Sequence, residues 1–497
     1  MSLGKHIFGV SVMTGISRVF GFVRDLLVAH VFGAGRLSDI FLAAFKLPNL
    51  FRDLLGEGAL SSIFIPMYAD RNKDEYFAKN VFSWLMVILL FIAILFEIFM
   101  PIVVWILAPG FADDPGKMQL TVVISRIMFW YVVFICASAF LSAILNAFSR
   151  FLLVAFMPVL LNVMLIGALL LAAWFAPMTI LYIMAVTVVL AGILQFAILW
   201  ARIRRHHFGL RLIRPRWTPA IKSMFKRLGI GIVGNGFYQI TTIVGTLVAS
   251  FQSGAVSWLY YSDRMIQLPN ALIALAVGTV LISSMSNAMA QKNMASVYRQ
   301  QNISMRQSMM LIMPCVVGLF VLAEPIIQYL FEYGAWTHES THAVAMAMMI
   351  QVLVLPAMMI SQIYSKTLYA SQDVRTPVTT SIISLVVAIL IYIGAFHFVG
   401  YLAIPIGVVV SGYLKNYLLR RACRKRDLIR TEPRTRRAIA AFGALAALLG
   451  VGLWFIPIPN IWILFVAIGG FAIIYLPVAY LIDKKYSQNK VENGTFV

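Results

Sequence analysis

Long apolar runs, separated by short polar segments, follow one another along almost the whole chain. A helix crosses the hydrocarbon of a bilayer with roughly 20 consecutive apolar residues. Runs of about this length or longer are predicted over roughly 6–31, 36–66, 81–108, 120–147, 153–174, 178–201, 226–250, 263–290, 307–331, 344–370, 376–398, 401–419, 437–456 and 461–482. The pattern predicts an all-α polytopic membrane protein with about fourteen transmembrane helices.

The composition agrees with this class. Of the 497 residues, 61% are hydrophobic and only 12% are charged, whereas a soluble globular protein has roughly 25% charged residues. Too little polar surface is available to cover a fold exposed to water, and the polar composition of a disordered chain is missing. The first run could pass for a signal peptide, but it contains Arg18, Arg24 and Asp25 and lacks a small-residue cleavage site. We therefore expect it to be a retained first helix.

The formal net charge of +21 is mostly a topology signal. Basic residues concentrate in alternate connectors, above all between 202 and 227 and between 415 and 437, while the opposite connectors hold only Arg36 and Lys117. Cytoplasmic connectors carry the positive excess, so both termini are predicted to be cytoplasmic. The two basic connectors are short, have few aromatic residues and match no nucleic-acid motif, which favours attraction to anionic lipid head groups over nucleic-acid binding.

A small set of cations lies inside the predicted spans. These are Arg18, Arg24, Lys46, Arg52, Arg126, Arg264 and Lys366. A charge at the centre of a membrane helix costs about 2.5–3.5 kcal/mol on insertion scales, so such residues face a bundle interior or a wet cavity. The acids near them are Asp25, Asp39, Asp53, Glu57 and Asp263. This balance predicts a net cationic chamber with some internal pairing.

The second predicted span carries a polar stripe. Lys46, Asn49, Asp53 and Glu57 fall within an arc of roughly 80° at 100° per residue. Pro48 removes a backbone hydrogen bond and is expected to kink the helix there. Arg52 falls outside the arc. Either the kink changes the direction of its side chain, or the side chain extends to the polar interface of the membrane. Each of these residues, taken alone, could instead be a structural charge held in a salt bridge.

An internal repeat favours a transporter. Leu47-Pro48-Asn49 recurs as Leu268-Pro269-Asn270, and a weaker echo places Asn146 to Arg150 opposite Ser371 to Arg375. Six helices per unit restore the same orientation, so we expect two six-helix lobes in a parallel repeat, with two helices appended. The predicted parts are an N-terminal lobe over 1–204, a basic linker over 205–227, a C-terminal lobe over 228–425, and the last two helices with the tail over 426–497.

Enzyme signals are weak. His338-Glu339-Ser340-Thr341-His342 fits the H-E-x-x-H zinc motif, but it lies in the connector before the tenth span without a third ligand nearby, and we interpret it as a polar loop. Asp113 and Asp114 are too few for a polytopic glycosyltransferase. There is no phosphate-binding loop motif and no connector long enough for a nucleotide-binding domain. The sequence therefore predicts a transporter without catalytic residues, metal or cofactor.

Several motifs together resemble one family. They include Ser17-Arg18-Val19-Phe20-Gly21-Phe22-Val23-Arg24-Asp25, Phe32-Gly33-Ala34-Gly35, Phe45-Lys46-Leu47-Pro48-Asn49-Leu50-Phe51-Arg52, Ser257-Trp258-Leu259-Tyr260-Tyr261-Ser262-Asp263-Arg264 and Ser371-Gln372-Asp373-Val374-Arg375-Thr376-Pro377. They resemble the MurJ (MviN) lipid II flippases of the multidrug/oligosaccharidyl-lipid/polysaccharide exporter superfamily. The resemblance spans most of the chain.

The resemblance implies a flippase of the bacterial inner membrane. Such a protein turns lipid II, an undecaprenyl-pyrophosphate-linked muropeptide, from the cytoplasmic to the outer leaflet by alternating access. The implied substrate-binding residues are Arg18, Arg24, Arg52, Arg264, Asn49 and Ser17. The implied gate and cavity residues are Asp39, Glu57, Ser257, Asp263, Lys46 and Asp53. The last two helices are expected to form an apolar groove for the lipid tail. Contacts with membrane lipids and with other cell-wall synthesis proteins also fit this role.

The alternative is a cation-coupled multidrug or polysaccharide exporter of the same superfamily. A drug exporter is expected to have a carboxylate-dominated pocket, the reverse of this one. Some relatives use carboxylates of the C-terminal lobe for sodium, but the seventh, eleventh and twelfth predicted spans contain no Asp or Glu, only residues such as Asn235. Membrane potential is therefore the expected driving force. The exact head group, the energy source, the resting conformation and the oligomeric state are left open.

Overall fold

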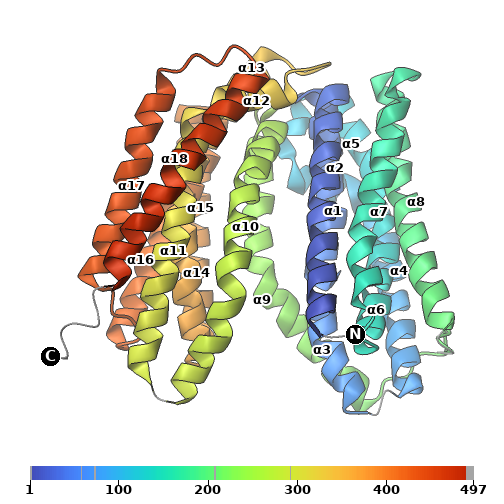
Figure 1. The fold of residues 1–497 in the computed structure, drawn as a ribbon. Coiled ribbons are helices and arrows are strands. Elements are labelled where there is room, and N and C mark those ends of the chain that lie inside the picture. The colour runs from blue at the N-terminus through green and yellow to red at the C-terminus, as the bar shows by residue number, and fades with distance from the viewer. Residues whose placement is uncertain (1–2, 57–58, 72–73, 206–208, 292, 489–497) are drawn as a thin grey trace. The chain divides into compact units, whose positions relative to one another are not determined.

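The computed structural model describes residues 3–56, 59–71, 74–205, 209–291 and 293–488 (Figure 1). Over these residues the chain forms helices and connectors, with no strand. The all-α prediction is therefore confirmed.

The chain divides into two compact units, and each is described by itself. The first comprises Met1–Ser257 with Tyr333–Thr337, and the second comprises Trp258–Glu332 with His338–Val497. The first unit contains α1 (Leu3–Phe32), α2 (Arg36–Phe51), the π-helix η1 (Arg52–Gly56), α3 (Ala59–Ala69), α4 (Glu75–Leu107), η2 (Pro109–Asp113), α5 (Pro115–Phe129), α6 (Tyr131–Ala147), α7 (Phe151–Leu170), η3 (Leu171–Ala173), α8 (Pro177–Arg204) and α9 (Pro219–Ala249).

The helix α10 (Ala255–Ala290) begins at the end of the first unit and continues in the second. The second unit also contains α11 (Met294–Val321), α12 (Ala323–Phe331), α13 (His338–Gln351), η4 (Val352–Val354), α14 (Leu355–Ala370), α15 (Arg375–Val399), η5 (Gly400–Leu402), α16 (Ala403–Lys425), α17 (Pro433–Trp454) and α18 (Ile461–Gln488). The first unit includes α9, which packs against α3 and α4. The predicted lobe boundaries stay predictions.

Many of these helices can cross a bilayer. Among the described residues, nine helical segments are long and apolar enough to do so, including Glu75–Leu107, Pro177–Arg204 and Ile461–Ser487. The chain is thus a multi-pass membrane protein, while the count of fourteen crossings stays a prediction. The helices α1, α2, α9 and α10 are not among the nine. Most of the predicted site residues lie on three of these helices, α1, α2 and α10.

Two connectors are anchored in the same way, one in each unit. Asn80 of α4 donates Nδ2 to the carbonyl oxygen of Arg216 and accepts the Arg216 N–H at Oδ1, both at 2.9 Å. Asn302 of α11 donates Nδ2 to the carbonyl oxygen of Arg430 at 2.8 Å and accepts the Glu432 N–H at 3.0 Å. Each connector leads into a helix that begins at a proline, α9 or α17. This recurrence is what a parallel repeat would produce.

The core of the first unit is aromatic. Phe64 of α3 stacks on Tyr68 and packs edge-on against Phe140 of α6, and Phe82 of α4 stacks on the same Phe140 ring. Other apolar side chains stay on the outside, such as Phe91 of α4 at 65% exposure. In a protein that spans a membrane, such exposed apolar side chains face lipid.

Candidate functional site

A buried ionic group joins α1 to α7. Arg24 is 6% exposed, and its Nη2 lies 2.6 Å from Oδ1 of Asp25, which is 3% exposed. Its Nη1 donates to Oδ1 of Asn162 at 3.0 Å, and Nδ2 of Asn162 donates to the carbonyl oxygen of Ser17 at 3.2 Å. A buried charge is tolerated only when it is paired and hydrogen-bonded. Asp25 and Asn162 thus hold the guanidinium of Arg24 in one orientation.

Arg18 differs from Arg24 in its surroundings. It lies on the same helix, but its side chain is exposed, and among the described residues no carboxylate lies within ion-pairing distance of it. The side chain of Ser17 is partly buried. The two arginines of α1 are therefore a fixed buried cation and an accessible one.

The irregularity of the second predicted span lies after its proline. Pro48 is inside α2, which continues to Phe51, and the π-helix η1 follows over Arg52–Gly56. The kink expected at Pro48 stays a prediction, and the change from α-helical to π-helical geometry lies about one turn after it. A π-helix adds a residue per turn and rotates the side chains that follow. Arg52 and Asp53 are the first two residues of this π-helix.

The polar stripe predicted on the second span faces α9 in part. Lys46 Nζ donates to Oγ1 of Thr246 at 2.6 Å, and Oδ2 of Asp53 accepts a hydrogen bond from Nε2 of Gln239 at 3.1 Å. Arg52 Nη2 pairs with Asp53 Oδ1 at 3.0 Å, so the structure brings this predicted cation and acid together. Glu57 lies outside the described residues.

The Leu-Pro-Asn motifs share one feature. In each, the side-chain oxygen Oδ1 of the asparagine, Asn49 or Asn270, is buried and has no hydrogen-bond partner among the described residues. A buried polar atom without a partner is costly and calls for an explanation by function or by a bound group. The repeated motif thus places an available acceptor at the same point in each repeat.

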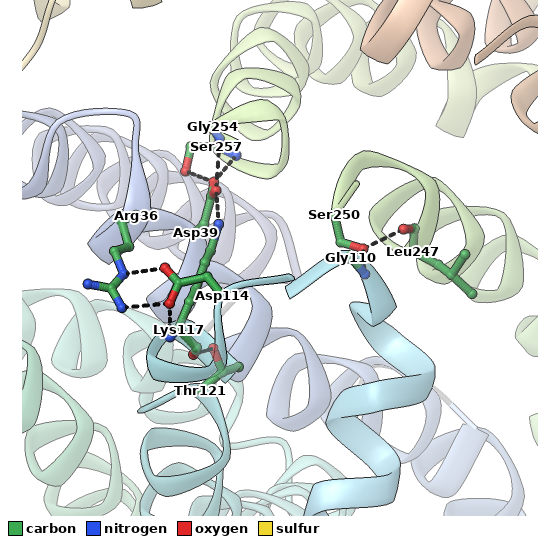
Figure 2. Close-up of polar contacts among 10 residues, drawn as sticks. All are labelled: Arg36, Asp39, Gly110, Asp114, Lys117, Thr121, Leu247, Ser250, Gly254 and Ser257. Carbon is green, nitrogen blue, oxygen red and sulfur yellow. Dashed lines mark hydrogen bonds and ion pairs between the residues drawn. The ribbon is translucent and has the colours of Figure 1, made fainter. Parts of the chain in front are cut away.

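Asp39 is the centre of a polar network (Figure 2). Its side chain is fully buried. Oδ2 accepts hydrogen bonds from Nζ of Lys117 at 2.8 Å and from the N–H of Gly254 at 3.0 Å, while Oδ1 accepts from the Ser257 N–H at 3.0 Å and from its Oγ at 2.6 Å. The carboxylate therefore joins α2 to α5 and to the connector between α9 and α10.

Lys117 was predicted to lie in a connector, and this prediction was wrong. It belongs to the first turn of α5, is 5% exposed, and its Nζ lies 3.9 Å from the centroid of the Phe111 ring. Charge pairing with Asp39 explains why a lysine can be buried here. Next to it, Asp114 caps α5 by accepting the Lys117 N–H, and it pairs with Arg36 (Figure 2). The backbone hydrogen bond, helped by Arg36, holds the pKa of Asp114 below its usual value.

The same end of the first unit holds a docked segment. The N–H of Ala335, in Tyr333–Thr337, donates to the carbonyl oxygen of His30 at 2.8 Å. Gly33, with a φ of +65°, approaches this segment so closely that an added Cβ would lie 2.4 Å from the Ala335 carbonyl oxygen. Only glycine fits this backbone conformation and this spacing. The segment Tyr333–Thr337 therefore packs against the C-terminal end of α1.

In the second unit, Arg264 and Asp263 have local partners. Nε and Nη2 of Arg264 donate to the Tyr260 hydroxyl at 3.1 Å and 2.8 Å. Gln351 of α13 donates Nε2 to Oδ1 of Asp263, and its Oε1 accepts a hydrogen bond from Ser262 at 3.2 Å. The structure therefore groups Asp263 with Gln351, and Arg264 with Tyr260.

The H-E-x-x-H segment begins α13 and is not a loop, contrary to the prediction. Nδ1 of His338 lies 3.2 Å from Oε1 of Glu332, and Oγ1 of Thr341 donates to Oε2 of Glu332 at 2.6 Å. Within the described part of the chain, no three His, Cys, Asp or Glu side chains are grouped so that they could hold a metal ion. Here Glu332 joins the two ends of the connector that carries the docked segment.

Several partners were missed by sequence reasoning. They are Asn162, Lys117, Thr246, Gln239 and Gln351. Each is a polar residue in or beside an apolar run, and that was the only signal available. Their roles depend on residues far away in the chain, which a local pattern does not identify.

Comparisons with known proteins point to one family. The sequence model of the family described as "Lipid II flippase MurJ" matches residues 28–470. The "Probable lipid II flippase MurJ" of Rhizobium tropici is 34% identical over 423 residues, 83% of this chain and 79% of the relative. The "Lipid II flippase MurJ" of Burkholderia cenocepacia is 31% identical over 471 residues, 91% of this chain and 90% of the relative.

Solved structures share the fold. A structure described as "Lipid II flippase MurJ, inward closed conformation" has a TM-score of 0.83 at 22% identity and covers 96% of this chain and 98% of its own. An inward-facing multidrug resistance MATE transporter of the MOP superfamily has a TM-score of 0.66 at 16% identity and covers 86% of this chain and 96% of its own. At these identities the likeness concerns the fold alone.

Proposed function

This chain belongs to the lipid II flippase MurJ family, and we propose that it moves lipid II from the cytoplasmic to the outer leaflet of the bacterial inner membrane by alternating access. The protein acts as a transporter and performs no covalent chemistry. Both termini lie in the cytoplasm, as the distribution of Lys and Arg predicts. Contacts with other cell-wall synthesis proteins belong to the same hypothesis.

The pyrophosphate of the substrate is bound by arginines. Arg18, Arg24, Arg52 and Arg264 supply permanently charged planar donors that match phosphate oxygens, with Asn49 and Ser17 as polar neighbours. The observation that carries this assignment is the buried group of Arg24, Asp25 and Asn162, because charges inside a membrane protein are costly to bury and commonly mark a substrate path. The exposed side chain of Arg18 on the same helix supplies a second cation for the same anion.

Asp39 and Ser257 form the outer gate. With cytoplasmic termini, the end of α1 and the start of α2 lie on the outer side, and the Asp39 network and the docked segment Tyr333–Thr337 both lie there. Lys46, Asp53 and Asp263 line the substrate path. The prenyl tail runs along α17 and α18, whose lipid-facing side chains include Phe465 at 57% exposure.

The test is lipid II transfer in proteoliposomes. Arg18→Gln and Arg24→Gln are expected to slow transfer by about tenfold or more, which corresponds to about 1.4 kcal/mol of lost stabilisation. Arg205→Gln, at the exposed end of α8, is the matched control and should stay within about twofold of the unsubstituted protein. Full transfer by both α1 variants, with normal insertion, would refute the arginine assignment.

The same vesicles separate the alternatives. A multidrug exporter would move cationic dyes in response to an ion gradient and would leave lipid II where it is. A metalloenzyme would lose activity on His338→Ala, which in the flippase should change lipid II transfer by less than about twofold because His338 is exposed.

A further inference from the structure

Three charged residues of the second span recur at a regular spacing. Asp39, Lys46 and Asp53 are each seven residues apart along α2 and η1. A straight α-helix drifts by only about 20° over seven residues, so Asp39 and Lys46 lie along one face of α2, and Asp53 follows at the start of the π-helix η1. Their charges alternate as negative, positive and negative.

The partners of Asp53 and Lys46 have the same spacing in the opposite direction. Asp53 bonds to Gln239 and Lys46 bonds to Thr246, seven residues later on α9. Asp39 bonds to Ser257, where α10 begins. Because residue numbers rise along α2 while they fall along α9, the contacts form three rungs between antiparallel segments. We call this set the polar ladder.

The rungs differ in strength. Asp39 is fully buried and accepts four hydrogen bonds, one of them from a lysine. The side chain of Asp53 is 30% exposed, and its described partner on α9 is a neutral amide. Lys46 is partly buried and bonds to a hydroxyl. Exposure weakens a charged hydrogen bond because water replaces it easily, so the Asp53 rung should open first and the Asp39 rung last.

The partners on α9 share a property that suits a reversible contact. Gln239 and Thr246 are neutral, so separation from α2 leaves no unpaired charge on α9. Leaving a charge behind in a low-dielectric region would be costly. The charges of α2 can then turn to water or to an anionic head group.

We propose that Thr246 and Gln239 are positioning residues that hold Lys46 and Asp53 toward α9 in the polar ladder, and release them when α9 leaves α2 during transport. This inference rests on the proposed flippase function and adds the partners of two of its cavity residues. Thr246 and Gln239 act through these charged side chains and do not touch the substrate. Their loss should therefore slow the cycle more than it weakens substrate binding.

The experiment measures transfer rates in proteoliposomes over a range of lipid II densities. Thr246→Val keeps the size of the side chain and removes the hydroxyl, and Gln239→Leu removes the amide. Both are expected to lower the maximal rate by about threefold to tenfold, with the half-saturating density changed by less than about twofold. Thr246→Ser keeps the hydroxyl and should restore the rate. Thr187→Val is the matched control, because the Thr187 hydroxyl bonds to the Ile183 carbonyl of its own helix.

The structural consequence is read at a native cysteine. Cys136 is 1% exposed and its Sγ lies 3.9 Å from the carbonyl oxygen of Phe51, next to η1. With Cys315 and Cys423 replaced by alanine, a water-soluble maleimide should label Cys136 at least about threefold faster in Thr246→Val and Gln239→Leu than in Thr187→Val.

Two failures can be told apart. If the unsubstituted protein does not transfer lipid II, the proposed function falls. If it does, and both Thr246→Val and Gln239→Leu transfer within twofold of it with unchanged Cys136 labelling, the polar ladder falls. A rate in Thr246→Ser as low as in Thr246→Val would also overturn the proposal, since the hydroxyl would then not be the group that matters.

Discussion

Asp39→Asn should destabilise the first unit strongly. The substitution keeps the shape of the side chain but removes the charge that compensates the buried Lys117 ammonium, 2.8 Å away. It also turns an NH2 group toward a set of four donors, so at least one hydrogen bond is replaced by a donor-donor contact. Breaking a buried ion pair by removing one partner costs about 3–5 kcal/mol, and we expect a loss in this range.

Two further variants show how much each interaction of Asp39 contributes to this loss of stability. Ser257→Ala removes one hydrogen bond to a charged group and should cost about 1.5–3 kcal/mol. Lys117→Met leaves Asp39 with the three donors from Gly254 and Ser257, so it should cost less than Asp39→Asn. The double variant Asp39→Asn/Lys117→Met removes both charges, and its loss should be smaller than the sum of the two single losses by about 1–3 kcal/mol.

The assay is equilibrium unfolding of the purified protein in mixed micelles, followed by tryptophan fluorescence. Far-UV circular dichroism before unfolding shows that each variant keeps its helices. The reasoning is refuted if Asp39→Asn changes the free energy of unfolding by less than about 1 kcal/mol, or if the two single effects add in the double variant, since a buried ion pair cannot behave in either way.

Two other predictions concern close packing and a second buried pair. Gly33→Ala should destabilise the docking of Tyr333–Thr337 by about 2–4 kcal/mol, because the backbone at Gly33 is left-handed and a Cβ would lie 2.4 Å from a backbone carbonyl oxygen. Gly35→Ala is the control, because an added Cβ there meets open space. Proteolysis of Tyr333–Thr337 in native membranes compares the two variants, and equal cleavage of both would contradict the prediction. Asp483→Asn should lower the free energy of unfolding by about 3 kcal/mol, because it leaves the buried Arg306 of α11 without its carboxylate at 2.8 Å. Glu97→Gln, in an ion pair whose side chains are about 40% exposed, should lower it by less than about 1 kcal/mol. Thermal unfolding in nanodiscs compares the two variants, and a similar loss in both would show that burial is not the cause.

The helices and the class of protein could be read from the sequence because both depend on local pattern. An apolar run such as that in α4 forms a helix wherever it lies, since its backbone groups must be satisfied within the segment in lipid. The cations of the first two spans were also recognisable, because a charge in such a run is costly in any fold. The family followed from motifs around Arg18 and Lys46, which are continuous in sequence.

The partners of those charges could not be read in the same way. The sequence assigned Lys117 to a connector on the side opposite the basic connectors, and only the packing of α5 beside α2 brings it to Asp39. The proline of α2 was visible, but the π-helix after it depends on how the next turn packs. Arg306 of α11 is buried against Asp483 of α18, a pairing that no local pattern around either residue indicates.

The sequence by itself therefore determined that this chain is a multi-pass helical membrane protein of the lipid II flippase family and which charges are costly. Only the tertiary structure decided how each charge is compensated: Arg24 by Asp25 and Asn162, Lys46 by Thr246, and Asp39 by Lys117 and Ser257. The physical reason is that a charge in a low-dielectric interior needs a donor or acceptor within about 3 Å, and apart from Asp25 these partners are brought by helix packing from 78 to 218 residues away in the chain.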